Sequence, residues 1–511
     1  NSYGQLGDGS YTNAIHPATV GGLSNSILRL GGGKIGDNVY DVSKGNRLPN
    51  IVTVAENETV NIDISSITKS SGFNLVSISD PVNAGSLEFK SMDESIATVN
   101  GGAITPNQDK IYGSTKIIIK DTESGWQTMI VVKVKPAGTV ASPKIAIGTN
   151  HTVALKADGT VWTWGLNSSG QLGNGTKVNS AAPVKVEGLE GVIDVAAGDL
   201  GSVALLSDGT VKCWGDNGDG RIGDGTNEAK LVPTDNVIKA DKKKLENIIA
   251  VFSGRGSVFA IDKDGKLWSW GNNDAYRLGI GKEGHVNVAT PVAGGQAGTG
   301  QLGDVIEVES AHCAVIALKA NGTVFTWGHG KGGSLGDGLT DVSTTPIQVL
   351  KGKDGDEVSP VSKKYLETIV AVSLADSYGD GGYTLFGALT ERGSLYVWGH
   401  DAVHPTGNSE TDILTPIKSK FETELKMISL GNSGDRDSQW ILGLGKDGKF
   451  YGGGYNGYGQ TGIGSTGSGL MKKRIDDRLD GLLQIKLSEG GSHAGGVRSD
   501  GTVVMWGINN V

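Results

Sequence analysis

The chain has 511 residues, with 46 Lys and Arg against 55 Asp and Glu, and a formal net charge of −9 at neutral pH. This negative balance argues against a surface built to neutralise phosphates, so nucleic acid is not an expected partner. Because 82 glycines leave few windows with apolar residues at helical spacing, the sequence predicts an all-β chain. No apolar run approaches the roughly 20 residues that cross a bilayer, so we expect no membrane insertion.

The first ten residues match a later glycine-rich turn, residues 167–176, which follows a Trp-Gly pair. The chain ends shortly after another such pair, Trp506-Gly507. The first half of the first unit therefore lies at the other end of the chain. We expect one unit to be assembled from both termini, which would close a ring and hide unpaired strand edges. A segment of a longer array of repeats is the alternative.

The composition changes between residues 47 and 137. The preceding stretch 27–33 is similar to the first strand of a repeat unit, although no second strand follows it. Within 47–137, short strands such as 51–54 and 116–119 alternate with turns at the spacing typical of a β-sandwich. Residues 91–106 and 113–119 resemble the bacterial immunoglobulin-like domain of group two. The resemblance implies an immunoglobulin-like sandwich inserted into the first repeat unit, with a core of its own.

From residue 138 onward one phrase recurs, in its fullest form Asp-Gly-Thr-Val-Trp-Thr-Trp-Gly at residues 158–165. The seven copies occupy residues 158–165, 208–215, 264–271, 321–328, 392–399, 447–454 and 500–507. Asp-Gly tolerates positive φ at both centres of a tight turn and an alternating run follows, which predicts a hairpin whose second strand ends at Trp-Gly. Apolar residues on both faces of that strand indicate a sheet covered on both sides, as a propeller blade is.

The tryptophan before the final glycine of the phrase is expected in the core, for example Trp164 and Trp327. The copy at 447–454 has Gly453 in its place, so we expect that unit to be the locally weakest. A two-sheet sandwich is the alternative fold for these strands, but it gives no reason for seven similar units.

Each phrase belongs to a longer frame, with two strands upstream, as in residues 145–155, and a glycine-rich turn downstream, as in 167–176. This frame resembles the regulator of chromosome condensation repeat. The resemblance implies a seven-bladed β-propeller, closed by both termini, over residues 1–46 and 138–511, with the sandwich of residues 47–137 as an insertion.

Candidates for chemistry are few. His151, His312 and His493 are assigned to one position of the frame, which favours structural hydrogen bonding over metal binding. Residues 216–220 are similar to a calcium loop but lack its later glutamate, which favours a turn. The basic run 242–244 is interpreted as solvated surface.

The two cysteines, Cys213 and Cys313, fall in different units and are expected as buried thiols. No nucleophile elbow, phosphate loop or zinc-protease motif is present. The sequence therefore predicts no catalytic residue, metal or cofactor, and a protein that is not an enzyme.

Tyrosines give a candidate contact surface. Tyr3 and Tyr458 occupy the same place in the same turn of adjacent units, and Tyr455 lies near Tyr458. A tyrosine in an exposed turn offers a rigid amphipathic surface of the kind that interfaces favour. We expect these three residues to bind a partner on one face of the ring; packing of each tyrosine on its own loop is the alternative.

The sequence favours a secreted or cell-surface bacterial module for binding or adhesion, with a protein or surface glycan as its ligand. The location is implied by the resemblance of the insert, whose relatives are common in bacterial adhesins. A structural subunit of a surface layer or filament, formed by self-assembly, is one alternative. Propellers that act like a guanine-nucleotide exchange factor or a β-lactamase inhibitor are others, because one fold carries many functions.

Overall fold

The computed structural model describes residues 25–29, 34–35, 38–39, 50–63, 86–123, 125, 127–233, 237–352, 364–376, 383–401, 412–421, 423–432, 438–456, 461, 469–473, 482–487, 493–498 and 503–507. This part of the chain is almost entirely β-structure, which confirms the all-β prediction. Its helical segments are three short 3-10 helices: η4 (Asp274–Tyr276), η5 (Gly295–Ala297) and η6 (Lys331–Gly333). Among these described residues, no helix is long and apolar enough to pass through a membrane.

Seven antiparallel sheets of consecutive strands, here sheets 1 to 7, follow one another from residue 144 to residue 507. Each copy of the phrase supplies the third strand of one sheet, as predicted.

Sheet 1 consists of β11 (Lys144–Ile147), β12 (His151–Leu155), β13 (Val161–Gly165) and β14 (Ser180–Lys185). Sheet 2 consists of β15 (Val192–Ala197), β16 (Gly201–Leu206) and β17 (Val211–Gly215). Sheet 3 consists of β18 (Ile248–Ser253), β19 (Ser257–Asp262), β20 (Leu267–Gly271) and β21 (Val286–Pro291). Sheet 4 consists of β22 (Val305–Ser310), β23 (Ala314–Lys319), β24 (Val324–Gly328) and β25 (Ser343–Gln348).

Sheet 5 consists of β26 (Ile369–Asp376), β27 (Thr384–Thr390), β28 (Leu395–His400) and β29 (Asp412–Lys418). Sheet 6 consists of β30 (Leu425–Asn432), β31 (Gln439–Gly445), β32 (Phe450–Gly454) and β33 (Gly469–Lys473). Sheet 7 consists of β34 (Leu482–Leu487), β35 (His493–Arg498) and β36 (Val503–Gly507).

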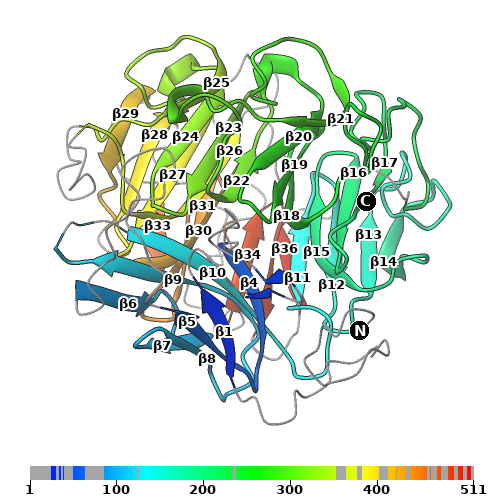
Figure 1. Cartoon of the computed structure of the whole chain (residues 1–511). Helices are drawn as coiled ribbons and strands as arrows, with labels where there is room; N and C mark the ends of the chain where they lie inside the picture. The colour runs from blue at the N-terminus through cyan, green and yellow to red at the C-terminus, as the bar shows by residue number, and fades with distance from the viewer. Residues whose placement is uncertain are drawn as a thin grey trace.

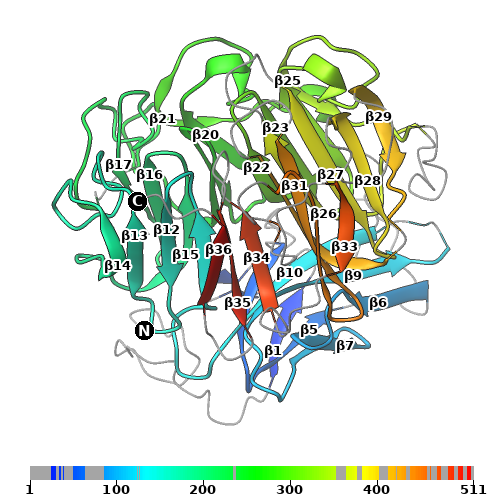
Figure 2. The same cartoon turned by 180° about the vertical axis from the view of Figure 1, so that it is seen from behind.

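The first strands of the sheets lie side by side around a common centre (Figures 1 and 2). Each one contacts the first strand of the next sheet, from β11 to β34, and β34 contacts β11 in turn. Ile145 and Ile147 of sheet 1 also pack with Val497 of sheet 7. Contacts among the described strands therefore run around a ring. Closure by the two termini stays a prediction, because residues 1–24 and 508–511 lie outside the described residues.

The Asp-Gly hairpin differs in detail from the expected turn. Gly159 has φ of +80°, but Asp158 is not among the residues with positive φ. The Gly159 N–H donates to the Lys156 carbonyl, and Asp158 Oδ1 accepts the Thr160 N–H at 3.0 Å. The expectation of positive φ at both centres was wrong, because the chain makes a longer turn in which only the glycine is left-handed.

The phrase tryptophans join neighbouring sheets. Trp214, Trp270, Trp327 and Trp398 are fully buried, which confirms the predicted core role for these four. Each indole Nε1 donates to a carbonyl in the glycine-rich turn of the preceding sheet: Trp214 to Gln171 at 2.9 Å, Trp270 to Arg221 at 3.0 Å, Trp327 to Arg277 at 2.7 Å and Trp398 to Ser334 at 3.1 Å.

Trp164 is only half-buried, so the prediction of a full core role was wrong for this residue. In the repeat frame its covering turn would come from residues 1–10, which lie outside the described residues. In sheet 6, Gly453 pairs with Ile441, and that sheet has no indole at the phrase position.

Two further sheets form a sandwich ahead of the ring in sequence. One contains β1 (Asn25–Arg29), β5 (Thr59–Asp63), β8 (Ala103–Pro106) and β7 (Ala97–Asn100) in that order. The other contains β4 (Ile51–Ala55), β10 (Gln127–Lys135), β9 (Gly113–Asp121) and β6 (Leu87–Ser91). A small ribbon pairs β2 (Lys34–Ile35) with β3 (Asn38–Val39). Side chains of both larger sheets share one apolar core, which includes Val54, Ile104, Ile117 and Val132.

Strand β1 corrects one expectation from the sequence. The segment around Ile27 was compared with the first strand of a repeat unit, but the structure pairs β1 with β5 in parallel within the sandwich. An apolar segment of this kind can form a strand in any half-buried sheet, so its own sequence does not determine with which strand it pairs. The boundaries at residues 47 and 137 remain a prediction.

The sandwich lies against one end of the ring (Figure 1). Ile118 of β9 and Met129 of β10 belong to the same apolar core as Ile316 and Val372 of sheets 4 and 5. Ion pairs add to this contact, since Lys116 Nζ lies 2.6 Å from Glu307 and Lys133 Nζ lies 2.9 Å from Asp194.

Candidate functional site

The two ends of the ring differ in what they expose. Asp194, Glu307 and Lys426, near the starts of their first strands, pair with sandwich residues, so this end is covered. Because the strands are antiparallel, the glycine-rich turns that follow each Trp-Gly lie at the opposite end. We call this opposite end the turn end.

Four of the glycine-rich turns are built around a buried asparagine, whereas Gly330 and Asp401 stand at that position after β24 and β28. Asn217 Oδ1 accepts the N–H of Ile222 at 2.9 Å, and its amide nitrogen donates to the carbonyls of Thr226 and Glu228 at 3.0 and 3.1 Å. Asn167, Asn273 and Asn456 accept the corresponding N–H in their own turns. One side chain thus satisfies several backbone groups and holds the turn in a fixed shape.

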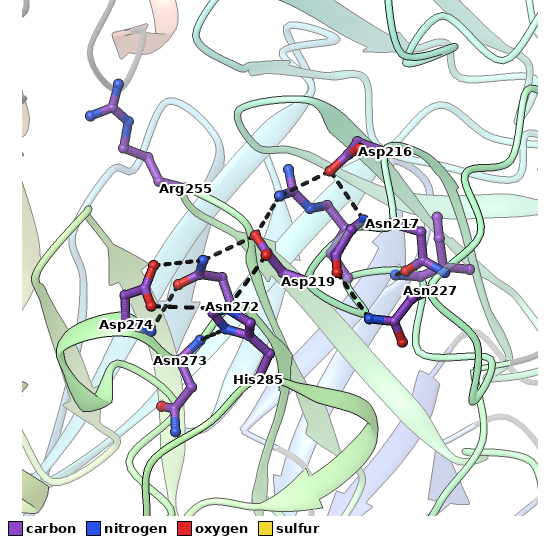
Figure 3. Close-up of polar contacts among 12 residues, drawn as sticks. Asp216, Asn217, Asp219, Asn227, Arg255, Asn272, Asn273, Asp274 and His285 are labelled. Atoms are coloured by element: carbon purple, nitrogen blue, oxygen red, sulfur yellow. Dashed lines mark hydrogen bonds and ion pairs between the residues drawn. The ribbon is translucent and has the colours of Figure 1, made fainter.

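A polar cluster bridges two neighbouring turns, as Figure 3 shows. Its six members come from the loops that follow β17 and β20: Asp216, Asp219, Arg221, Asn272, Asp274 and His285.

Arg221 and Asp219 are the centre of the polar cluster. Arg221 Nη2 lies 3.1 Å from Asp216 Oδ2 and 2.8 Å from Asp219 Oδ2. Asn272 Nδ2 donates to the same oxygen of Asp219 at 3.0 Å, and His285 Nε2 lies 3.5 Å from its other oxygen. Asp219 therefore connects the turn of sheet 2 to the turn of sheet 3.

These contacts favour the ionised form of Asp219. Burial by itself raises the pKa of Asp219, but the Asn272 hydrogen bond and the Arg221 and His285 charges together hold that pKa below its ordinary value. The Arg221 side chain is 10% exposed, whereas those of Asp274 and His285 are 63% and 40% exposed. A buried guanidinium thus supports an exposed rim of an acid and an imidazole.

Arg255, Arg277 and His312 lie next to the polar cluster. Arg277 Nη1 donates to the Arg255 carbonyl at 2.5 Å, and Figure 3 shows the Arg255 side chain directed away from Asp219. Burial and the charges of Arg277 and Arg255 lower the pKa of His312 to about 4. His312 is therefore neutral at neutral pH.

The histidines do not share one position, contrary to the sequence analysis. His151 and His493 begin β12 and β35 and pair with Gly165 and Gly507. His312 precedes β23, in which Ala314 pairs with the equivalent Gly328, so the assignment of His312 was wrong. The connections before β12 and β23, residues 148–150 and 311–313, have equal lengths, so His312 lies within its connection and Ala314 takes the place of His151. His151 Nε2 lies 2.9 Å from Ser202 Oγ, as a structural hydrogen-bonding residue would.

Residues 216–220 form a turn, as expected. Within the described part of the chain, no group of three or more His, Cys, Asp or Glu is placed to hold a metal ion. Cys213 and Cys313 are buried and form no disulfide bond. Lys242, Lys243 and Lys244 are exposed.

The predicted tyrosine surface is only partly within the described structure. Tyr3 and Tyr458 lie outside the described residues. Tyr455 follows β32 directly, is half-buried, and donates its N–H to the Gln439 carbonyl at 2.8 Å. Its position is at the turn end, but the association of the three tyrosines stays a prediction.

Sequence reasoning missed the polar cluster. A usable signal was present, since Arg221 and Arg277 stand in their turns where Gln171 stands in the first turn. Arginine at a position that is neutral in another copy indicates a local specialisation of the turn end.

Comparison with known proteins places the chain in a family. The model of the RCC1-like domain matches residues 120–435. The chain therefore belongs to the RCC1-like domain family, as the repeat frame indicated.

Individual relatives are similar over different lengths. Human E3 ubiquitin-protein ligase HERC2 is 33% identical over 275 residues, which cover 53% of this chain and 5% of HERC2. Ultraviolet-B receptor UVR8 of Arabidopsis thaliana is 27% identical over 371 residues, 71% of this chain and 64% of that protein. The chain thus spans less than two thirds of the length of these curated relatives.

Solved structures show the same fold. Human WBSCR16 matches with a TM-score of 0.53 and 18% identity, over 68% of this chain and 88% of that chain. Prp20p of Saccharomyces cerevisiae matches with a TM-score of 0.53 and 20% identity, over 70% of this chain and 82% of that chain.

Proposed function

We propose that this protein is a non-catalytic binding module that recognises another protein through the turn end of its ring. The observation that carries the proposal is the polar cluster, in which a buried arginine holds together the turns of two sheets beneath an exposed acid and imidazole. A partner that meets this surface finds charged groups already fixed in place, so little ordering entropy is lost on binding.

The arrangement favours recognition over chemistry. Arg221 is paired with two carboxylates, and Asp219 is held by Asn272 and His285, so these groups position one another. Arginine is enriched where interfaces have strong contacts, and fixed charges give specificity. The solved relative Prp20p is described with binding properties to Gsp1p and histones, which supports protein binding by this fold.

The proposal includes the finer architecture. The seven sheets are taken as blades of one propeller, closed by the two termini, and the cyclic contacts of the first strands support this. The sandwich is taken as an immunoglobulin-like insertion over residues 47–137, supported by its two packed four-stranded sheets. Placement on a bacterial cell surface or in the medium, with an adhesive role, rests on the resemblance of the insert, and fractionation of the source cells tests it.

The test of binding uses charge reversal on the exposed rim. The double variant Asp274→Lys/His285→Glu is compared with wild type for capture of cell-surface proteins, and captured partners are then titrated by calorimetry. We expect the variant to bind at least about tenfold more weakly, as for loss of a contact of about 1.4 kcal/mol. Glu187→Lys is the matched control, because the Glu187 side chain is 78% exposed and far from the cluster in sequence.

Two results would contradict the proposal: equal binding by the rim variant, or turnover of a substrate by the wild type. Stimulated nucleotide release from small GTPases would instead favour an exchange-factor role. Inhibition of a β-lactamase would favour the inhibitor role, and filaments in electron micrographs would favour a structural subunit.

A further inference from the structure

A cavity of about 300 Å³ lies between the ring and the sandwich, far from the turn end. Its walls include residues from the first strands of all seven sheets, β11, β15, β18, β22, β26, β30 and β34, and from β4, β9 and β10 of the sandwich. This volume falls at the lower limit of the ~300–1,000 Å³ typical of small-molecule sites. The cavity belongs to both domains, so neither domain would form it alone.

Much of the wall is apolar. Val131 of β10, Phe252 of β18 and Met427 of β30 line the cavity and are only half-buried, so each retains apolar surface outside the packed cores. Water in contact with such a wall is readily displaced by an apolar group of suitable size. Methionine also adapts its shape to a ligand at small cost. The wall therefore suits a compact hydrocarbon body.

The ionic groups of the cavity do not balance. Five lysines line it, against four carboxylates, which leaves one positive charge in excess. Three of the lysines each have a carboxylate: Lys116 with Glu307 at 2.6 Å, Lys426 with Asp93 at 2.8 Å and Lys486 with Glu309 at 2.8 Å.

The excess charge is located at one corner. Lys133 and Lys144 share a single carboxylate, that of Asp194, at 2.9 and 2.6 Å. Burial and the charges of Lys133 and Lys486 lower the pKa of Lys144, although Asp194 opposes that shift. The side chain of Asp194 is 3% exposed, so the corner is poorly screened by solvent. A negative charge beside Lys144 would relieve this imbalance.

We propose that the cavity binds a small organic monoanion, a carboxylate with an apolar body, whose charged group lies beside Lys133 and Lys144. One unit of excess charge matches a monocarboxylate and not a dianion. Hydrogen bonds from lysine to carboxylate are charge-assisted and strong in a partly buried site. The hydrocarbon part packs against Val131, Phe252 and Met427.

The direct test is calorimetric titration of the intact chain with octanoate, alongside 1-octanol as a neutral probe of equal chain length and acetate as a charged probe without a tail. We expect saturable binding of one octanoate, with the other two probes at least about tenfold weaker. Equal binding of 1-octanol would overturn the anion requirement, and equal binding of acetate would reduce the cavity to a plain anion site. Absence of saturable octanoate binding would reject the proposal.

Substitutions in the cavity wall test where octanoate binds. Lys144→Met should weaken octanoate binding at least about tenfold, as expected for loss of a charge-assisted bond, while Lys144→Arg should retain most of the affinity. Met427→Gln should weaken binding through the apolar wall without altering the ionic corner, which keeps the test valid if Lys144→Met fails to fold. The control is Lys177→Met, since Lys177 is exposed and lies outside the cavity lining. Octanoate affinity that is unchanged in both Lys144→Met and Met427→Gln would exclude this cavity as the site.

Discussion

The indole Nε1 of Trp327 donates a 2.7 Å hydrogen bond to the carbonyl oxygen of Arg277, which lies 50 residues earlier in the turn of the preceding sheet. A Cβ built on Gly279, two residues beyond Arg277, would lie 2.9 Å from that Nε1, so only glycine leaves room for the ring. The pair thus combines a buried aromatic surface, a satisfied polar group and a close backbone approach in one contact between sheets.

Replacement of Trp327 by alanine should destabilise the protein by about 3–5 kcal/mol, because a fully buried indole is lost and a cavity remains. Trp164→Ala should cost clearly less, since Trp164 is half-buried. Urea denaturation with tryptophan fluorescence and circular dichroism measures both variants. Equal losses for the two variants would show that burial does not govern the contribution of these residues.

The stability of the contact between the sandwich and the ring should depend on pH through Asp194. Its pKa is lowered to about 2, because Lys133 and Lys144, together with their hydrogen bonds, outweigh the burial that by itself raises the pKa. A lowered pKa in the folded state means that the stabilisation is present above the ordinary value of 3.8 and is lost as pH falls through about 2.

The variant Asp194→Asn should remove this acid dependence and cost up to about 3 kcal/mol at neutral pH, because two half-buried lysines lose their shared carboxylate. Melting temperatures of wild type and variant between pH 2 and 7 provide the measurement. Glu228→Gln is a control, because the Glu228 side chain is 85% exposed. A variant that keeps the wild-type acid profile would contradict the assignment.

His312 should make a separate contribution at milder acidity. Its pKa is about 4 in the folded chain against an ordinary 6.5, mainly because of burial and then Arg277 and Arg255. The unfolded chain therefore binds a proton first, and stability should fall as pH decreases from about 6.5 to about 4. In His312→Asn this part of the slope should disappear, which denaturation at closely spaced pH values would reveal; an unaltered slope would refute it.

The sandwich should fold as an independent unit. A fragment of residues 47–137 should unfold cooperatively, since Val54, Ile104, Ile117 and Val132 share a core that does not depend on the ring. A longer fragment of residues 21–137 should be more stable, because β1 then covers the edge of β5. Circular dichroism and thermal melting of the two fragments test both expectations. Equal stability of the two fragments would exclude a stabilising role for β1. A disordered spectrum of the shorter fragment would show that the sandwich does not fold without the ring.

Local signals explain how much of this fold could be predicted from the sequence. Asp-Gly and Trp-Gly mark the ends of a strand within eight residues, so the third strand of every sheet was located correctly. The polar cluster could not be found in this way. Its central contact joins Asp219 to Asn272, 53 residues apart, and depends on how two turns are placed by the packing of their sheets. The partner of β1 was missed for the same reason.

Gly453 makes the contact between sheets 5 and 6 different in kind from the contacts made by the phrase tryptophans. Each of the four buried phrase tryptophans bonds its own sheet to the glycine-rich turn of the preceding sheet, whereas sheet 6 has a glycine at the position of the indole. The contact between sheets 5 and 6 therefore depends on apolar packing, because Phe386 and Leu389 of sheet 5 share one core with Ile441 and Tyr451 of sheet 6. This contact should respond to a loss of apolar volume, whereas the contacts made by the four tryptophans should also respond to the loss of a hydrogen bond.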